Sequence, residues 1–263
     1  MNNVKIIVAT TKPYWMPQDK MYLPLQVGAT GKPPIGYLRD DTGDNISFKN
    51  ANYCELTGLY WAWKNLDCDA IGLVHYRRYL GKFGFTSKQK RIATSSQVEH
   101  WLTQADVIVP KPRHYYIENN WSQYVHAHHE GDIELLRHCI QKHSPDYLLA
   151  FDKVMKRTWG HRFNIFIMKK TMLSQYCNWL FNLLENMEKQ LTTKNYSTYQ
   201  ARVYGFLGER LLDVWLEKNN VRYFERSVLY MQHQNWITKV FRFIKRKYYP
   251  QKKGGLSGEC SID

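Results

Sequence analysis

Segments rich in β-branched and apolar residues alternate along this chain with segments whose apolar residues recur at helical spacing. The first kind predicts short strands at residues 4–9, 70–74, 106–109, 163–168 and 221–225. The second kind predicts helices at residues 53–65, 96–104, 132–143, 146–157, 171–188 and 199–218. Alternation of this kind is typical of an α/β domain with an open, mostly parallel sheet flanked by helices. The stretch 13–50, rich in Pro, Gly, Asp and Asn, is expected to be an ordered loop region.

The aromatic content requires a large core, because nine Trp, nineteen Tyr and eleven Phe among 263 residues exclude a disordered chain. This length supports one core, so we expect a single domain over residues 1–230 and a tail over 231–263. No run of about 18 apolar residues is free of charges, which excludes a transmembrane helix. Lys5 interrupts the apolar start of the chain, so residues 1–10 predict a strand and not a secretory signal.

The cysteines show no paired spacing. Cys54, Cys68, Cys139, Cys177 and Cys260 are odd in number and form no CxxC motif. Unpaired thiols are typical of a reducing compartment, so we expect a cytoplasmic protein whose cysteines are mostly small buried hydrophobic residues.

Half of the net charge of +14 comes from residues 236–253, which carry seven basic and no acidic residues. If this segment is helical, its Trp, Phe and Ile residues lie on one face and most of its Lys and Arg residues lie on the opposite face. A basic amphipathic helix of this kind is typical of an element lying in an anionic membrane surface, here the inner face of the cell membrane. The alternative is a helix packed on the domain with a solvated basic face. Nucleic acid is not expected as a partner, because no recognition helix or RNA-binding signature occurs.

The ends of the predicted strands locate a candidate site, because open α/β sheets bind ligands at the carboxyl edge of their strands. Two adjacent arginines follow the strand at 70–74, and arginine forks match phosphate oxygens bidentately. They predict a diphosphate-bearing substrate; the alternative is that one of them pairs with a structural carboxylate. The donor-binding residues expected at this edge are Thr10, Thr11, Lys12, Lys49, His75, Tyr76, Arg77 and Arg78.

Several uncommon segments occur in one order along residues 4 to about 226, among them YCELTGLYWAWKN, IGLVHYRRYL, YVHAHHEGD, FNIFIMKK and ARVYGFLGERLLDVWL. In these segments the chain resembles a family of bacterial capsular and exopolysaccharide proteins catalogued as a domain of unknown function, some of which are described as galactofuranosyltransferases. The resemblance implies a nucleotide-sugar-dependent glycosyltransferase with a Rossmann-related GT-A fold. It further implies inverting transfer of galactofuranose from UDP-galactofuranose, with a β-linked product. The implied acceptor is a polyprenyl-diphosphate-linked oligosaccharide in capsule, O-antigen or exopolysaccharide synthesis.

The layout is also similar to that of galactosyltransferases related to glycogenin, which hold a metal with a DxD motif at the end of a central strand. Here the DxD at residues 67–69 precedes the strand at 70–74, at the opposite edge of a parallel sheet. The basic motif at 75–78 stands where the metal is expected, and arginines can neutralise a leaving diphosphate. We therefore expect no metal cofactor, with Mg²⁺ or Mn²⁺ as the alternative. A reserve metal cluster would consist of Asp40, Asp41 and Asp44.

Three carboxylates are candidates for the general base that takes the acceptor hydroxyl's proton. Glu209 is the first choice, because its helix follows the Asn164 strand and would close the site over the sugar; Glu55 and Asp213 are the reserves. Asn164 is expected to bind a sugar hydroxyl, and Arg210, amid an apolar helix face, to reach a donor phosphate. The alternatives are a structural Glu209–Arg210 network and an Asn164 satisfied by backbone.

A histidine cluster completes the candidate residues. His126, His128 and His129 are expected to bind acceptor hydroxyls, and their spacing also permits zinc. Two other functions compete with sugar transfer: a non-catalytic membrane-associated scaffold of polysaccharide assembly, and a metal-dependent hydrolase that uses these histidines.

Overall fold

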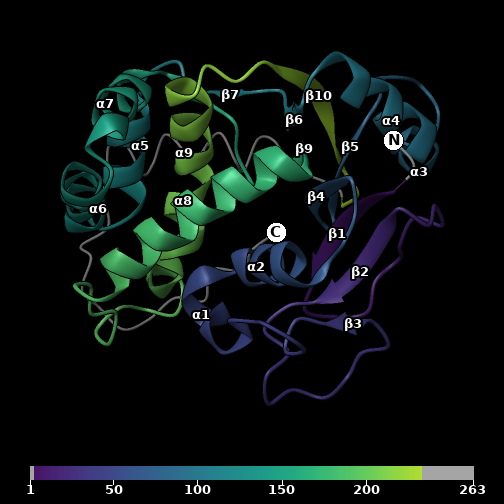
Figure 1. The fold of residues 1–263 in the computed structure, drawn as a ribbon, viewed down its shortest axis with the longest axis horizontal. Helices are drawn as coiled ribbons and strands as arrows, with labels where there is room; N and C mark the ends of the chain where they lie inside the picture. Colours follow the sequence, from purple (N-terminus) through teal and green to yellow (C-terminus); the bar gives the residue numbers. More distant parts are fainter. Residues whose placement is uncertain (1–2, 233–263) are drawn as a thin grey trace.

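The sheet is organised about β1 (Val4–Thr10), whose apolar residues face both of its sides. In this computed structural model, which describes residues 3–232, β1 pairs in parallel with β2 (Tyr22–Gln26) and β4 (Ala70–His75). The two-residue β3 (Leu38–Arg39) extends this parallel half beyond β2. Figure 1 shows these strands together on one side of the molecule.

The other half of the sheet is mixed. It contains β5 (Arg78–Gly81), β6 (Val107–Pro110), β9 (Phe166–Lys169) and β10 (Tyr223–Tyr230). β9 runs antiparallel to β4 and β6, and β10 is parallel to β6 but antiparallel to β5. Across the whole sheet, six strands (β1 to β4, β6 and β10) run in one direction and two, β5 and β9, run against them, so the sheet is mixed with parallel strands in the majority. The chain enters β9 from the carboxyl edge of β4, where the carbonyl of Phe163 meets His75, so β9 must run against its neighbours.

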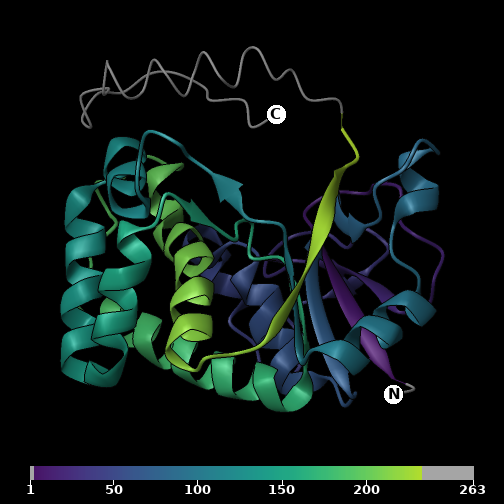
Figure 2. The same ribbon diagram turned by 90° about the horizontal axis from the view of Figure 1, so that it is seen from above.

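Side chains alternate between two cores along the strands. Ile7 and Val107 enter the larger core, whereas Ile6 and Ile108 enter the smaller one. Figures 1 and 2 show α4 (Ser95–Gln104) on the side of the smaller core. The longer helices that contribute to the larger core are α2 (Leu56–Asn65), α5 (Asn120–Ala127), α6 (Glu130–His143), α7 (Leu148–Lys156), α8 (Lys170–Glu188) and α9 (Val203–Lys218).

The expected helices all occur, with two differences. The helix expected over 53–65 is divided into α1 (Asn50–Tyr53) and α2, because Cys54 between them has a φ of 54°. α5 is an additional helix, and its start is stabilised by a capping box in which Asn119 accepts from the backbone N–H of Ser122.

The strands expected at 163–168 and 221–225 differ in their bounds, and β2 is an additional strand. β2 lies inside the expected loop region 13–50. Its five residues include Pro24, which is unusual in a strand, so the sequence pattern does not indicate one there. β9 begins at Phe166 and not at residue 163, because positive φ angles precede it. β10 begins at Tyr223 and not at residue 221, and it continues to Tyr230.

Short elements complete the described chain. They are η1 (Ser47–Lys49), α3 (Lys88–Arg91), β7 (Arg113–His114), η2 (Pro145–Tyr147), β8 (Trp159–Gly160) and η3 (Gln200–Arg202). Within residues 3–232, every helix is too short or too polar to cross a bilayer. The amphipathic helix expected at 236–253 lies outside the described residues.

Candidate active site

Two parallel strands end side by side at the carboxyl edge of the sheet. The β1–β4 register pairs Ala9 with His75, and the backbone N–H of Tyr76 donates to the carbonyl of Ala9 at 3.2 Å. The chain then turns, and Arg78 begins β5 opposite the end of β10. Figure 2 shows β10 running toward this edge. The basic motif therefore lies where open sheets bind ligands.

A strained loop brings Asn164 to this edge. Its side-chain amide donates to Glu55 Oε1 at 2.6 Å and to the carbonyl of Gly205 at 3.1 Å. Phe163 and Asn164 have φ angles of 78° and 50°, which residues other than glycine rarely adopt. Cys54, next to Glu55, also has a positive φ. Backbone strain of this kind collects at functional sites, where the surrounding structure maintains it.

His75 is oriented by the same loop. Its Nε2 lies 2.6 Å from the carbonyl oxygen of Phe163 and 3.9 Å from Glu55 Oε1. Because a carbonyl oxygen can only accept, Nε2 carries the hydrogen and Nδ1 of the neutral ring is left as an acceptor. Burial lowers the pKa of His75 despite the opposing charge of Glu55, so the ring is neutral near neutral pH.

Two glycines let α9 approach the site closely. A Cβ atom on Gly205 would lie 3.0 Å from the sulfur of Cys54, and one on Gly208 would lie 3.3 Å from Asn164 Oδ1. Larger residues would push the helix away from both. The glycines thus place Glu209, the next residue of α9, beside the Asn164 loop.

Glu209 has the environment of a proton acceptor. Burial raises the pKa of Glu209, although Arg210 and Arg162 oppose the shift; Glu55 adds to it. Arg78 is also within electrostatic reach of this carboxylate. Among residues 3–232, no group donates a hydrogen bond to the Glu209 side chain. A carboxylate with a raised pKa and free lone pairs is suited to general-base catalysis.

Arg78 and Asn164 carry unpaired polar atoms. The guanidinium carbon of Arg78 lies 4.5 Å from the ring centroid of Phe163 and 6.0 Å from that of Tyr230. Burial lowers the pKa of Arg78, and the charge of Arg77 lowers it further. Arg78 Nε and Asn164 Oδ1 are buried without a hydrogen-bond partner. Buried polar atoms are nearly always paired, so these two atoms and the Glu209 carboxylate indicate a ligand position.

A basic rim extends this cluster along the strand ends. Lys12 Nζ and the Arg77 guanidinium carbon each lie 5.6 Å from the centroid of the Tyr76 ring. The Thr10 hydroxyl donates to the carbonyl of Lys12 at 2.6 Å and closes the turn after β1, while Thr11 is exposed. The rim therefore offers two cations beside an aromatic ring.

Two residues expected to bind the donor are engaged elsewhere. Lys49 Nζ lies 2.6 Å from a carboxylate oxygen of Glu188 on α8. Arg210 donates to the carbonyl of Phe206 at 2.8 Å and to the side chain of Gln123 on α5. Both side chains have structural partners, although Arg210 Nε is buried without one, so their role in donor binding stays a prediction.

Asp213 belongs to a buried network. One of its oxygens lies 2.5 Å from His161 Nδ1, and the other accepts from the backbone N–H of His161 at 3.0 Å. Arg162 lies 3.5 Å from Asp213 and donates to the hydroxyl of Tyr115 at 2.7 Å. Asp213 is 1% exposed and so is not placed to meet a substrate. The network instead anchors the chain just before the strained Asn164 loop.

The three candidate histidines do not share a ligand geometry. His126 Nδ1 lies 2.6 Å from Glu118 Oε1, and His128 is buried with its ring centroid 4.1 Å from that of Phe206. His129 stands at the start of α6. In the described part of the chain, no three His, Cys, Asp or Glu side chains converge as metal ligands.

Asp40, Asp41 and Asp44, the alternative metal ligands, do not form a cluster. Asp40 is fully buried and accepts from two backbone N–H groups and two hydroxyls at 2.5 to 3.0 Å. Asp41 pairs with Arg39 at 2.6 Å, and Asp44 accepts from the Tyr60 hydroxyl at 3.1 Å. Asp40 therefore connects the loop after β2 to α2, and the three carboxylates have separate partners.

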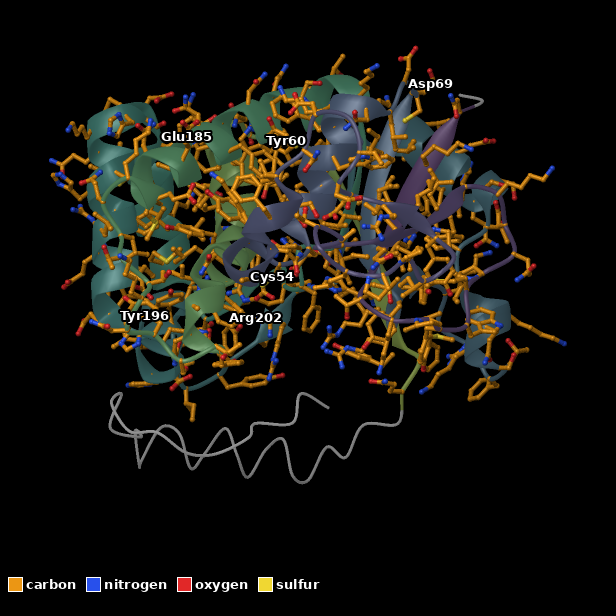
Figure 3. The ribbon with its side chains drawn as sticks, turned by 90° about the horizontal axis from the view of Figure 1, so that it is seen from below. Cys54, Tyr60, Asp69, Glu185, Tyr196 and Arg202 are labelled. Carbon is orange, nitrogen blue, oxygen red and sulfur yellow. The ribbon has the colours of Figure 1, made fainter. Side chains whose placement is uncertain are left out.

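The DxD motif lies far from the basic motif. Asp67 and Asp69 precede β4, and Asp67 pairs with Lys170 at 2.6 Å. They line an open hollow of about 630 Å³ at the amino edge of β1 and β4. Figure 3 shows Asp69 at the upper edge of the molecule, whereas Cys54 lies near the middle and Arg202 nearer the lower edge.

Two residues of the site were not predicted. Arg202 Nε donates to the sulfur of Cys54 at 3.1 Å and is within electrostatic reach of Glu55. Tyr230 lies over Phe163 because β10 is longer than expected. The sequence signal for Tyr230 is the apolar run at residues 228–230, which follows the strand expected at 221–225.

Comparisons with known proteins identify a structural relative and a family for this chain. The chain is similar to the apo structure of WbbM, a bifunctional glycosyltransferase, with a TM-score of 0.82 and 29% sequence identity. The match covers 88% of this chain and 46% of the WbbM chain, so this chain spans about half of that protein. Among curated proteins, none matches the sequence. The model of a family described as a domain of unknown function, DUF4422, matches residues 5–220, and the chain belongs to this family.

Proposed function

We propose that this protein is a glycosyltransferase that transfers a sugar from a nucleoside diphosphate donor. The observation that carries the proposal is the convergence of unpaired polar groups from Arg78, Asn164 and Glu209 at the carboxyl edge of the sheet. The similarity to WbbM supports the same class of reaction. A cation, an amide and a potential base are the groups that a sugar diphosphate and an acceptor hydroxyl require.

In the proposed reaction, the acceptor oxygen bonds to the anomeric carbon while the bond from that carbon to the diphosphate breaks. Glu209 takes the hydroxyl proton, and UDP leaves on the opposite face, so the configuration inverts. Arg77 and Arg78 stabilise the charge that develops on the departing diphosphate. Asn164 orients the sugar, and Glu55 in turn holds the amide of Asn164.

The finer assignment is transfer of galactofuranose from UDP-galactofuranose to a polyprenyl-diphosphate-linked oligosaccharide, giving a β linkage. It rests on the family resemblance of the HYRRY and FNIF segments, and it places the protein in capsule, O-antigen or exopolysaccharide synthesis at the inner face of the cell membrane. The test is a screen of UDP-sugars with a synthetic lipid-linked acceptor, read as UDP release and as the anomeric configuration of the product. We expect release with UDP-galactofuranose and a β product. An α product would overturn the inverting mechanism, and no release with any donor would favour the scaffold.

Activity is expected to persist in EDTA. The side chains at the strand ends beside the proposed diphosphate are arginines and a neutral histidine. The nearby Glu55 carboxylate already accepts from Asn164, and the DxD motif lies at the other edge, so these residues do not fit a metal bridge. The measurement is the rate of UDP release with EDTA and after addition of Mn²⁺. Loss of activity in EDTA and its return with Mn²⁺ would contradict this prediction.

Removal of residues 233–263 is expected to weaken binding to anionic vesicles, because residues 236–253 supply both apolar and basic residues. The measurement is co-sedimentation with vesicles that contain phosphatidylglycerol. Circular dichroism of the truncated protein checks that the domain is folded. Equal co-sedimentation of the truncated and the full chain would show that the tail is not a membrane element.

A further inference from the structure

The segment after β5, residues 82–91, exposes two phenylalanines. Phe83 is 84% and Phe85 is 101% exposed, and their ring centroids lie 6.2 Å apart. Exposing two large aromatic side chains together is costly in water, and neighbouring exposed apolar residues usually mark an interaction site.

The base of this segment is held in place. The backbone N–H of Lys82 donates to the carbonyl of Arg91 at 3.0 Å, and Arg91 Nη1 donates to the carbonyl of Gly84 at 2.6 Å. A bridge between Gly81 and Ile92 closes the same base. The phenylalanines are therefore presented by a closed loop and do not fold back onto the domain.

The charged residues of this segment are all basic. Residues 82–91 contain four basic and no acidic residues, namely Lys82, Lys88, Lys90 and Arg91. The segment ends in the short helix α3, which packs near β10. β10 runs toward the edge of the sheet that carries the candidate site, and Figure 2 shows α3 on that same side of the molecule.

We propose that residues 82–91 bind the surface of an anionic bilayer, with Phe83 and Phe85 inserted between lipid headgroups and the basic side chains beside the lipid phosphates. Anionic bilayer surfaces bind segments that combine aromatic side chains with basic side chains. A loop of ten residues is also far smaller than a stable protein–protein interface, which buries about 800 Å² on each partner. This contact is separate from the tail, and it turns the candidate site toward the membrane.

The test follows one fluorophore in the full chain. Acrylodan is attached to Phe85→Cys in a chain that also carries Cys260→Ser; Cys54, Cys68, Cys139 and Cys177 are buried. The matched control carries the label at Phe48→Cys, another exposed phenylalanine (69%). We expect a blue shift of the residue-85 label on phosphatidylglycerol vesicles but not on phosphatidylcholine vesicles, and no shift at residue 48.

Two substitution sets test the contact by affinity. Phe83→Ser with Phe85→Ser should weaken vesicle binding by about tenfold or more, and Lys88→Gln or Lys90→Gln by roughly fivefold each. Phe48→Ser should have no effect. An unchanged emission at residue 85 while the protein co-sediments would overturn the proposal, as would equal shifts at both positions or a failure to bind anionic vesicles.

Discussion

Glu209→Gln is expected to lower kcat by about 10²–10⁴ while donor binding is retained, because glutamine keeps the shape of the side chain but cannot accept a proton. The measurements are the rate of UDP release at saturating substrates and calorimetric binding of the donor. Glu185→Gln is the matched control, since that carboxylate is 61% exposed on α8. A kcat close to that of the parent protein would transfer the base role to Glu55, which lies within electrostatic reach of Glu209.

The pH dependence of the parent protein gives the same prediction a second readout. Because burial raises the pKa of Glu209 above its ordinary value of 4.5, activity should rise with pH through that higher pKa. The stability effect has the opposite sign. The folded protein holds this proton more tightly than the unfolded chain, so charging Glu209 costs stability as the pH rises from 4.5 to the raised value. The Gln variant should be at least as stable as the parent at alkaline pH, and this difference should vanish in acid.

Arg78→Ala is expected to lower kcat by about 10²–10³ and to raise the KM for the donor, because it removes charge from both the bound and the departing diphosphate. Its buried Nε has no hydrogen-bond partner, so the guanidinium is available to a ligand. Arg78→Lys should restore part of the donor affinity but not the rate, since an ammonium keeps the charge and loses the planar fork.

The control for this variant is Arg222→Ala, because Arg222 is exposed and lies just before β10. Arg78 also packs against two aromatic rings, so thermal unfolding of each variant separates a loss of stability from a loss of chemistry. If Arg78→Ala keeps the donor KM and kcat of the parent, the diphosphate does not bind beside this residue.

The main parts of the candidate site follow from sequence periodicity. Val4–Thr10 and Ala70–His75 are strongly apolar and β-branched, so the pattern alone places their ends at one edge of a sheet. That rule assigns the basic motif to the correct edge and the DxD motif to the opposite one. The same periodicity places Glu209 on α9, but it does not reveal which carboxylate has free lone pairs.

The sequence by itself determined the alternation of the main strands and helices, the carboxyl-edge position of His75 and Arg78, and the basic amphipathic pattern of the tail. These features depend on local periodicity, which short-range chemistry dictates. Only the tertiary structure decided the antiparallel direction of β9, the positive φ of Asn164, and the burial that occupies Asp213 but leaves Glu209 unpaired. Each of these depends on contacts between residues far apart in the chain. Strand direction, backbone strain and hydrogen-bond pairing are settled only when those distant partners meet.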